Sequence, residues 1–143
     1  MSDFFSSLMD TAIVPGFSRI GFIARSRLNH WDQVSGYDLT GKVVVVTGPT
    51  SGLGKECVRI LAPTGAQLVL VARNKEKCED VISSVRSLCT GPEPVCVVAE
   101  MGDLLSVGKA AREIAPRFAQ VFALVHNAGA LLNTREVSPQ GIE

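Results

Sequence analysis

The sequence lacks the cysteine and histidine patterns that hold structural metal ions. Its four cysteines include no pair with Cys-x-x-Cys spacing, and there are only two histidines. We therefore expect neither a metal site nor a disulfide framework. The cysteines are interpreted as reduced thiols, which is typical of a cytoplasmic protein.

The sequence also has no excess of positive or negative charge and no long apolar run. The 14 lysines and arginines balance 14 acidic residues, so the basic surplus of a nucleic-acid-binding domain is missing and we expect no nucleic-acid partner. No run approaches the roughly 20 apolar residues of a membrane-spanning helix. Asp3 and Asp10 stand where a secretory signal would carry positive charge.

Residues 1–40 differ in pattern from the rest, and we interpret them as an N-terminal arm. Apolar residues recur at helix-like spacing from Phe4 to Ile13, and they resume after a Pro-Gly break with arginines between them. Two interpretations stay open. The arm packs on the domain or on a partner subunit, or residues 1–28 form an amphipathic segment that contacts a membrane surface.

From residue 41 onward, short β-branched runs alternate with amphipathic helical stretches. The expected strands are residues 42–47, 67–72, 95–99 and 121–126, and the expected helices are residues 52–62, 75–88 and 104–115. This alternation predicts a parallel sheet with helices on both faces and the strand order 3-2-1-4. The fold class is therefore α/β, the N-terminal half of a doubly wound Rossmann fold, and residues 41–143 form this domain.

Two details of the helices can also be predicted. The apolar face of the first expected helix consists of Leu53, Cys57, Ile60 and Leu61. We expect this face to pack on the sheet. Asp103 precedes the third expected helix and has a side chain suited to cap its N-terminus.

The stretch from Gly48 to Gly54 predicts a phosphate-binding loop at the start of a helix. A P-loop needs Gly-x4-Gly-Lys followed by Ser or Thr. Here five residues separate the two glycines, and Lys55 is followed by Glu56. The magnesium-binding hydroxyl is missing and a carboxylate would repel phosphate, so the sequence disfavours a nucleoside triphosphate.

A dinucleotide-binding loop fits the same stretch better. Gly48 permits a sharp turn off the strand, Gly52 lets a pyrophosphate approach the backbone, and Gly54 lets the helix pack closely on the sheet. The helix N-terminus offers amide donors and the positive end of a dipole. Thr50 and Ser51 add hydroxyl donors.

Arg73, at the end of the second expected strand, bears on the choice between NAD and NADP. An NAD site normally has an acidic residue here, on the ribose 2′-hydroxyl. An arginine can instead bind a 2′-phosphate with charge-assisted hydrogen bonds. We predict NADP as the cofactor, with NAD less favoured, and a solvated arginine as the alternative interpretation.

Four motifs together resemble the short-chain dehydrogenase/reductase family. They are TGPTSGLG (47–54), LVARN (70–74), AEMGDLLSV (99–107) and HNAG (126–129), which are similar to the family's TGxxxGxG loop, NADP-type second strand, segment after the third strand and NNAG motif. The ending LLNTREVSPQGIE resembles the retinol-dehydrogenase-like branch, and the arm resembles a bacterial subgroup of it. The resemblance covers about residues 39–143.

The resemblance implies cofactor contacts at matching positions. The implied set is Gly48, Ser51, Gly52 and Leu53 for the pyrophosphate and adenosine ribose, Arg73 for the 2′-phosphate, Glu100 and Met101 for the adenine, and Asn127, Ala128 and Gly129 for the cofactor ribose. Thr50 and Gly54 complete the candidate cofactor-binding residues on the grounds given above. The last three would also tie the fourth strand to its neighbours. Three residues depart from the family pattern: Pro49 removes a loop amide, Glu100 replaces Asp, and His126 replaces the first Asn of NNAG.

The resemblance also implies an activity, hydride transfer between nicotinamide and a small carbonyl or alcohol. The family's catalytic Ser and Tyr-x-x-x-Lys follow the fourth strand, whereas the single tyrosine here, Tyr37, precedes the first. We therefore assign no catalytic residue and expect a fragment that holds the cofactor half, with an exposed fourth strand and without turnover of its own. Pairing into a homo-oligomer is expected of the full-length form. The alternative is a non-catalytic module that binds nucleotide or docks on a membrane or partner.

Overall fold

The computed structural model describes residues 18–31, 34–130 and 133–141, and the chain divides into two compact units. Residues 1–33 form one unit and residues 34–143 form the other. Each unit has its own internal contacts, so each is described by itself.

The described residues of the first unit include the helix α3 (Arg19–Leu28). Ser18 caps it, because the Ser18 side chain accepts a hydrogen bond from the backbone N–H of Gly21 at 3.4 Å. The helix expected between Phe4 and Ile13 lies outside the described residues. No helix among the described residues is long and apolar enough to cross a membrane. The predicted boundary between arm and domain at residue 40 stays a prediction.

The second unit is built on a four-stranded parallel sheet. Its strands are β1 (Val43–Thr47), β2 (Gln67–Ala72), β3 (Val95–Val98) and β4 (Ala123–Val125). They lie in the order β3-β2-β1-β4, and every neighbouring pair is parallel. This order confirms the predicted α/β fold and its 3-2-1-4 sheet.

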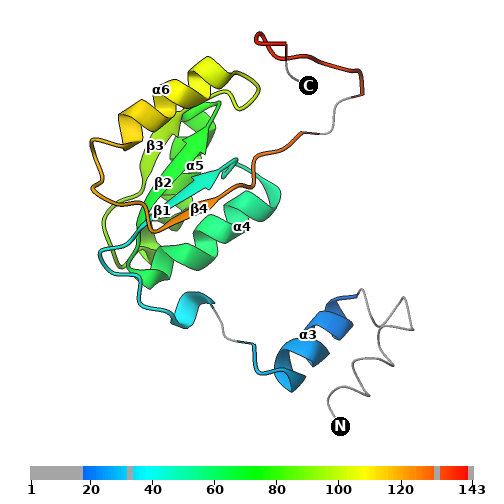
Figure 1. The fold of residues 1–143 in the computed structure, drawn as a ribbon. Helices are drawn as coiled ribbons and strands as arrows, with labels where there is room; N and C mark the ends of the chain where they lie inside the picture. The colour runs from blue at the N-terminus through cyan, green and yellow to red at the C-terminus, as the bar shows by residue number, and fades with distance from the viewer. Residues whose placement is uncertain (1–17, 32–33, 131–132, 142–143) are drawn as a thin grey trace. The chain divides into compact units, whose positions relative to one another are not determined.

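Helices cover both faces of this sheet. The α-helices are α4 (Gly52–Leu61), α5 (Lys75–Val85) and α6 (Leu104–Ile114), and the short 3₁₀ helices are η1 (Val34–Gly36), η2 (Ala62–Thr64) and η3 (Arg86–Leu88). Residues of α4 and α5 share one core with the sheet, whereas α6 packs on the opposite face (Figure 1). The expected helix 75–88 is thus an α-helix to Val85 that tightens into a 3₁₀ turn.

The alternation of side chains along β1 separates two hydrophobic cores. Val44 and Val46 belong to the core that α4 and α5 cover, together with the fully buried Val58. Val45 belongs to the core on the other face, where Ala110 of α6 packs. Successive strand residues point to opposite faces, so a run of valines is suited to a strand buried on both sides.

The apolar face predicted for α4 is partly wrong. Leu53 is 83% exposed, whereas Val58, which was not on the predicted face, is 0% exposed. The residues of α4 that the sheet buries are Gly54, Val58 and Leu61, spaced i, i+4 and i+7. Leu53 lies in the first turn and projects away from this stripe.

The strand β4 is shorter than predicted and lies at an edge of the sheet. It pairs with β1 over three residues, although residues 121–126 were expected. Leu124 is 51% exposed, while Val45, its Cα partner across the ladder, is 4% exposed. Since β4 is the last strand in the order β3-β2-β1-β4 and pairs only with β1, the predicted exposed edge is confirmed within the described residues.

Candidate functional site

The loop between β1 and α4 leaves the helix N-terminus open. Ser51 is the N-cap residue of α4, but its side chain makes no capping hydrogen bond. Gly52 has a left-handed φ of 52°, and a Cβ added there would meet no atom within 4 Å. The first amides of a helix need a partner from outside it. An anion such as a pyrophosphate is suited to that place.

Glycines also bring the loop close to the segment that follows β4. Gly48 has a φ of 64°, and a Cβ at this position would lie 2.8 Å from Cα of Ala128. A Cβ at Gly54 would collide with the carbonyl oxygen of Gly48 and with the side-chain amide of Asn127. The chain therefore needs glycine at both positions for α4 to pack against the end of β4.

Thr47 is the centre of the hydrogen-bond network at this junction. Its buried hydroxyl donates to the carbonyl oxygen of Val125 at 3.3 Å and accepts from the backbone N–H groups of Asn127 and Ala128 at 3.0 and 3.1 Å. The Asn127 side-chain amide donates to the carbonyl oxygens of Thr47 and Gly48 at 3.1 and 3.0 Å. The expectation that Asn127 and Ala128 tie the fourth strand to its neighbours is confirmed.

The role of Thr47 was missed from the sequence. Threonine is common in β-strands for its branched side chain, so a threonine at the end of a buried strand does not by itself indicate a polar role. Its position directly before the glycine loop could have indicated this role, because a buried hydroxyl there needs hydrogen-bond partners.

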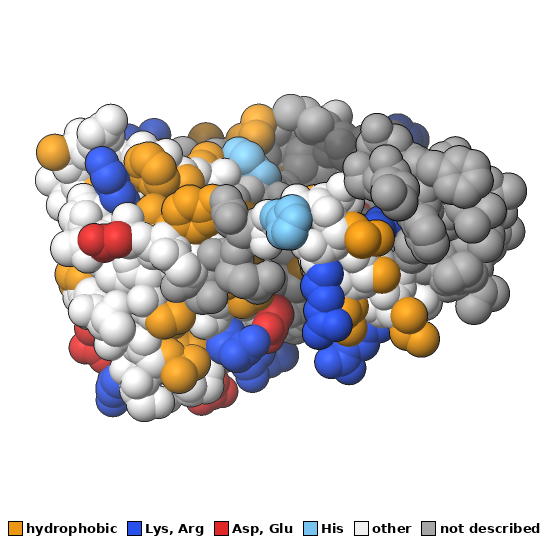
Figure 2. Space-filling view, turned by 90° about the horizontal axis from the view of Figure 1, so that it is seen from below, with side chains coloured by type: hydrophobic (Ala, Val, Ile, Leu, Met, Phe, Trp, Pro, Cys, Tyr) orange, Lys and Arg blue, Asp and Glu red, His pale blue; other side chains and the backbone are white. Residues whose placement is uncertain are grey.

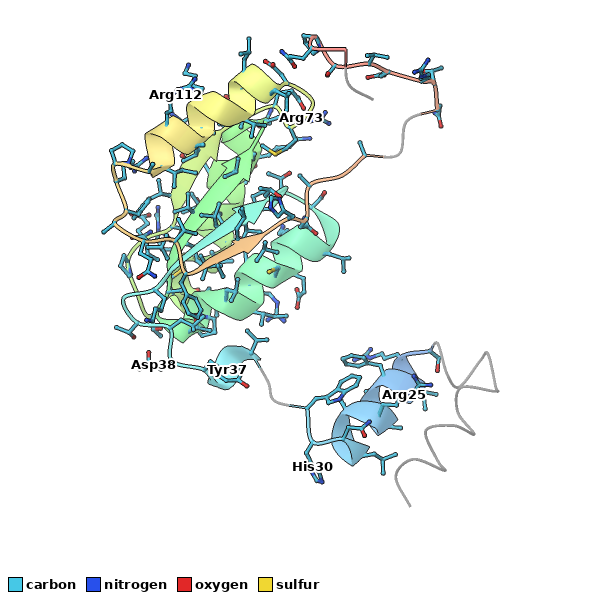
Figure 3. The ribbon with its side chains drawn as sticks, viewed as in Figure 1. Arg25, His30, Tyr37, Asp38, Arg73 and Arg112 are labelled. Carbon is cyan, nitrogen blue, oxygen red and sulfur yellow. The ribbon has the colours of Figure 1, made fainter. Side chains whose placement is uncertain are left out.

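Arg73 lies at the end of the next strand, β2, with its side chain exposed (Figure 3). Asn74 caps α5 by accepting a hydrogen bond from the backbone N–H of Lys77 at 2.8 Å, and its side chain is thereby occupied. Within the described ranges, Arg73 makes no ion pair, and Lys75 follows in the first turn of α5. The guanidinium of Arg73 is thus available to an anionic ligand.

The turn after β3 is held by its own side chains. Gly102 donates its backbone N–H to the carboxylate of Glu100 at 3.2 Å, and the backbone N–H of Glu100 donates to the hydroxyl of Ser106 at 3.0 Å. Met101 lies half-exposed between them. Glu100 therefore stabilises the turn, and the contact of Glu100 and Met101 with adenine stays a prediction.

Gln140 forms two hydrogen bonds at the N-terminus of α6 that were not predicted, and we call this contact the Gln140 clamp. Asp103 caps the helix as expected, accepting from the backbone N–H of Leu105 at 3.0 Å. Gln140 adds to this cap, because its side chain donates to the Asp103 carboxylate at 2.8 Å and accepts from the backbone N–H of Leu104 at 3.1 Å. Residues 138–141 are thereby held beside the turn after β3.

The candidate residues all follow strands at the carboxyl end of the parallel sheet. They come from the segments directly after β1, β2, β3 and β4, and Gly52, Leu53 and Gly54 form the first turn of α4. In doubly wound sheets, ligands bind at this end, where the strand order reverses. In the order β3-β2-β1-β4 that reversal lies between β1 and β4, where Thr47 and Asn127 meet. Whether each residue contacts a cofactor stays a prediction.

The cysteine thiols do not provide reactive groups at the carboxyl end of the sheet. Burial raises the pKa of the Cys78 thiol well above its usual range, and burial also raises the pKa values of Cys57 and Cys89. Cys78 and the partly buried Cys57, Cys89 and Cys96 belong to or pack against the core under α4 and α5. A raised pKa leaves little thiolate at neutral pH, so Cys57, Cys78 and Cys89 act as core-filling groups. Among the described residues, no cluster of His, Cys, Asp and Glu is suited to hold a metal ion.

Residues 42–143 match the family model described as short chain dehydrogenase. The chain belongs to the short-chain dehydrogenase/reductase family. A short-chain dehydrogenase/reductase of Armillaria gallica is 40% identical over 100 residues, which cover 70% of this chain and 32% of that protein. Dehydrogenase/reductase SDR family member 7B of Bos taurus is 36% identical over 132 residues, which cover 89% of this chain and 39% of that protein.

Solved structures of short-chain dehydrogenases share the fold. One is a metagenomic short-chain oxidoreductase in complex with NADP, with a TM-score of 0.59 and 30% identity over 64% of this chain and 41% of that chain. Another is levodione reductase, with a TM-score of 0.59 and 32% identity over 64% of this chain and 35% of that chain. The chain spans about a third of the length of the curated relatives it matches. The names of these relatives are those of short-chain dehydrogenases and family members 7B and 7C, so they do not single out the predicted retinol-dehydrogenase-like branch.

Proposed function

We propose that this short-chain dehydrogenase uses NADP and that residues 34–143 hold the dinucleotide-binding half of an oxidoreductase. The observation that carries the proposal is the pairing of an uncapped α4 N-terminus with an exposed arginine at the end of the adjacent strand β2. The first feature suits the pyrophosphate that all nicotinamide dinucleotides share. The second suits the 2′-phosphate that only NADP carries.

The residues at the carboxyl edge fit such a cofactor in three ways. Gly52 leaves open space where a Cβ would stand, so the backbone can be approached closely. The α4 amides and the Ser51 hydroxyl have no side-chain partner in the cap. Arg73 has no acidic neighbour in an ion pair among the described residues. Bound NADPH would supply a hydride for a carbonyl substrate, and these residues would bind its phosphates and position the dinucleotide.

The substrate and the branch of the family are finer parts of the proposal. We infer a small carbonyl or alcohol substrate, because the family's reactions are of that class. The retinol-dehydrogenase-like branch is inferred from the stretch that ends the sequence. We infer that the complete enzyme works in the cytoplasm, with homo-oligomers as its assembled form.

Replacement of Arg73 by Gln tests the cofactor preference. We expect NADP to bind the Arg73→Gln variant about 10- to 100-fold more weakly, because hydrogen bonds to charged groups contribute on the order of 1.5–3 kcal/mol. NAD should bind the variant and the wild type equally. The matched control is Arg112→Gln, since Arg112 is an exposed arginine on α6 (Figure 3). The cofactor dissociation constants are measured by isothermal titration calorimetry. Equal weakening of NADP and NAD by Arg73→Gln would contradict the proposal.

A non-catalytic nucleotide-binding module is the second candidate. It is favoured by the candidate residues themselves, because those at the carboxyl end of the sheet fit a dinucleotide and none of them was assigned a catalytic role. The 143-residue chain is mixed with NADPH and a panel of small aldehydes and ketones, and the absorbance of NADPH is followed. We expect no oxidation. Steady turnover would show that residues other than Tyr-x-x-x-Lys perform the chemistry.

A further inference from the structure

The Gln140 clamp uses both halves of one side-chain amide. Nε2 of Gln140 donates to Oδ1 of Asp103 at 2.8 Å, and Oε1 of Gln140 accepts from the backbone N–H of Leu104 at 3.1 Å. A glutamate in its place could accept but not donate when ionised, and a lysine or arginine could donate but not accept. An amide at position 140 can therefore make a contact that a charged side chain of similar length cannot.

Asp103, which the clamp holds, is the last residue of the turn after β3. The backbone N–H of Asp103 donates to the carbonyl oxygen of Glu100 at 3.2 Å and closes this turn. The Asp103 carboxylate also accepts from the backbone N–H of Leu105 at 3.0 Å and caps α6. Movement of Asp103 would therefore move the turn and the start of α6 together.

The same turn presents a backbone donor that the described residues leave unused. The N–H of Glu100 donates to the Ser106 hydroxyl, and the N–H of Gly102 donates to the Glu100 carboxylate. Among the described residues, the backbone N–H of Met101 has no hydrogen-bond partner. An N–H donor and a carboxylate acceptor in one turn match the edge of adenine, which carries the acceptor N1 beside the donor amino group.

We propose that Gln140 is a positioning residue for the recognition of adenine. This inference rests on the proposed function, in which the carboxyl end of the sheet binds NADP. Gln140 would not contact the adenine itself. It would hold Asp103, and Asp103 would keep the Met101 N–H and the Glu100 carboxylate at the spacing that the edge of the base requires.

The turn and the helix keep contacts of their own when the clamp is removed. The Asp103 cap on Leu105 and the bond from the Asp103 N–H to the Glu100 carbonyl do not involve Gln140. Leu104 is exposed, so water can replace Gln140 as the partner of its N–H. We therefore expect Gln140→Leu to leave the urea midpoint of unfolding almost unchanged.

Two dinucleotides that differ only in the base measure how precisely the turn is held. Nicotinamide hypoxanthine dinucleotide has a carbonyl oxygen where NAD has the adenine amino group, so its base cannot donate to the Glu100 carboxylate. We expect the 143-residue chain to bind NAD about 10-fold more tightly than this analogue, because the analogue loses a hydrogen bond to a charged group.

Removal of the clamp should remove this discrimination. We expect Gln140→Leu to bind NAD about 10-fold more weakly than the wild type and the hypoxanthine analogue less than about 2-fold more weakly. The dissociation constants are measured by isothermal titration calorimetry. A role in folding alone would weaken both dinucleotides by the same factor, so the ratio of the two constants separates positioning from stability.

A paired exchange tests the contact between positions 103 and 140. Gln140→Glu places a carboxylate against the Asp103 carboxylate, and we expect it to lose the discrimination as Gln140→Leu does. Asp103→Asn combined with Gln140→Glu restores a donor and an acceptor across the contact, because the new amide can donate to the new carboxylate. This double variant should recover most of the preference for NAD over the analogue.

Gln120→Leu is the matched control. Gln120 is an exposed glutamine between α6 and β4, on the side of the sheet where β4 begins. Figure 2 shows the molecule from below, on the side where the strands begin, and hydrophobic, basic and acidic side chains are mixed on that face. A neutral change at Gln120 should leave the affinities for both dinucleotides as they are in the wild type.

The possible results distinguish this inference from the proposed function. A wild-type chain that binds neither NADP nor NAD would overturn both. If the wild type binds NAD, this inference alone is overturned by equal binding of the hypoxanthine analogue, by an unchanged preference in Gln140→Leu, or by equal weakening of both dinucleotides. A paired exchange that binds like Gln140→Glu alone would also contradict it.

Discussion

The ends of two adjacent central strands, β1 and β2, are held in different ways. At the end of β1, five hydrogen bonds join the side chains of Thr47 and Asn127 to backbone groups, including each other's. A Cβ at Gly48 or Gly54 would collide with atoms of this junction. At the end of β2, Arg73 is exposed and makes no ion pair within the described residues. The hydrogen-bonded end of β1 thus lies beside a strand that ends in an exposed arginine without an ion pair.

This difference matches the two tasks of a dinucleotide site. The pyrophosphate is common to NAD and NADP, and a site for it gains from backbone that is fixed before the ligand arrives. The 2′-phosphate distinguishes the two cofactors, and one charged side chain is enough to recognise it. We therefore expect changes at the β1 junction to affect stability and all dinucleotides, and changes at Arg73 to affect NADP alone.

Replacement of Gly54 by Val should have the largest effect on stability. The added side chain would collide with the Gly48 carbonyl and the Asn127 amide, which cannot both move without breaking the junction. We expect a loss of about 3 kcal/mol or more in the free energy of unfolding. Urea unfolding followed by circular dichroism measures it.

The control for Gly54 is Gly102→Ala. A Cβ at Gly102 would lie 3.7 Å from the Glu100 carboxylate, an ordinary contact. Its effect should be within about 1 kcal/mol. Equal losses in the two variants would show that the close approach at Gly54 does not stabilise the fold.

Replacement of Thr47 by Val removes the hydroxyl and keeps the shape of the side chain. The Val125 carbonyl and the N–H groups of Asn127 and Ala128 would each lose a partner in a partly buried place. We expect a loss of about 2–3 kcal/mol in the free energy of unfolding. The same urea measurement on Thr90→Val is the control. The Thr90 hydroxyl makes one exposed hydrogen bond, to the carbonyl oxygen of Pro63, so this variant should lose less than about 1 kcal/mol.

Replacement of Gly52 by Ala separates binding from stability. Its φ of 52° costs an alanine about 1 kcal/mol, and the open space around it means that no neighbour has to move. The new methyl group would instead occupy the approach of the pyrophosphate. We expect NADP and NAD to bind about 10-fold more weakly or worse, by equal factors, in calorimetric titrations. Weakening of NADP alone would place the shared phosphate contact elsewhere.

The smallest effect is expected for the exposed ion pair on α4. The Arg59 side chain donates to the Glu56 carboxylate at 2.9–3.0 Å and thereby lowers the pKa of Glu56. A carboxyl with a lowered pKa in the folded state stabilises the protein above its unfolded pKa, and that contribution is lost as the pH falls through the folded pKa. We expect Glu56→Gln to reduce the urea midpoint slightly at pH 7 and not at pH 3. An equal reduction at both pH values would mean that charge is not its cause.

Much of the fold could be predicted from the sequence, because its signals are local. Runs of valine and leucine that follow Gly mark β1 and β2, and Asp103 marks the start of α6. The length of β4 was overestimated because its residues are as apolar as those of a central strand, although the ladder reaches only from Ala123 to Val125. The composition of a strand does not say how many neighbours it has.

The site was predictable to a smaller extent. The glycine positions and Arg73 follow from the chemistry that phosphate binding needs. The Thr47 hydroxyl and the Gln140 clamp were missed, because their partners lie 78–81 and 36–37 residues away in the chain. Contacts at such separations depend on the tertiary fold, which short-range patterns do not contain.

The most direct test of the comparison between β1 and β2 is to titrate the ¹⁵N-labelled chain with NADP and with NAD while amide chemical shifts are recorded. We predict that both cofactors shift the amides of Gly52, Leu53 and Gly54, and that NADP alone also shifts Arg73 and Asn74. Shifts confined to other parts of the chain, or identical patterns for the two cofactors, would contradict the account of a shared phosphate site at α4 and a 2′-phosphate site at Arg73.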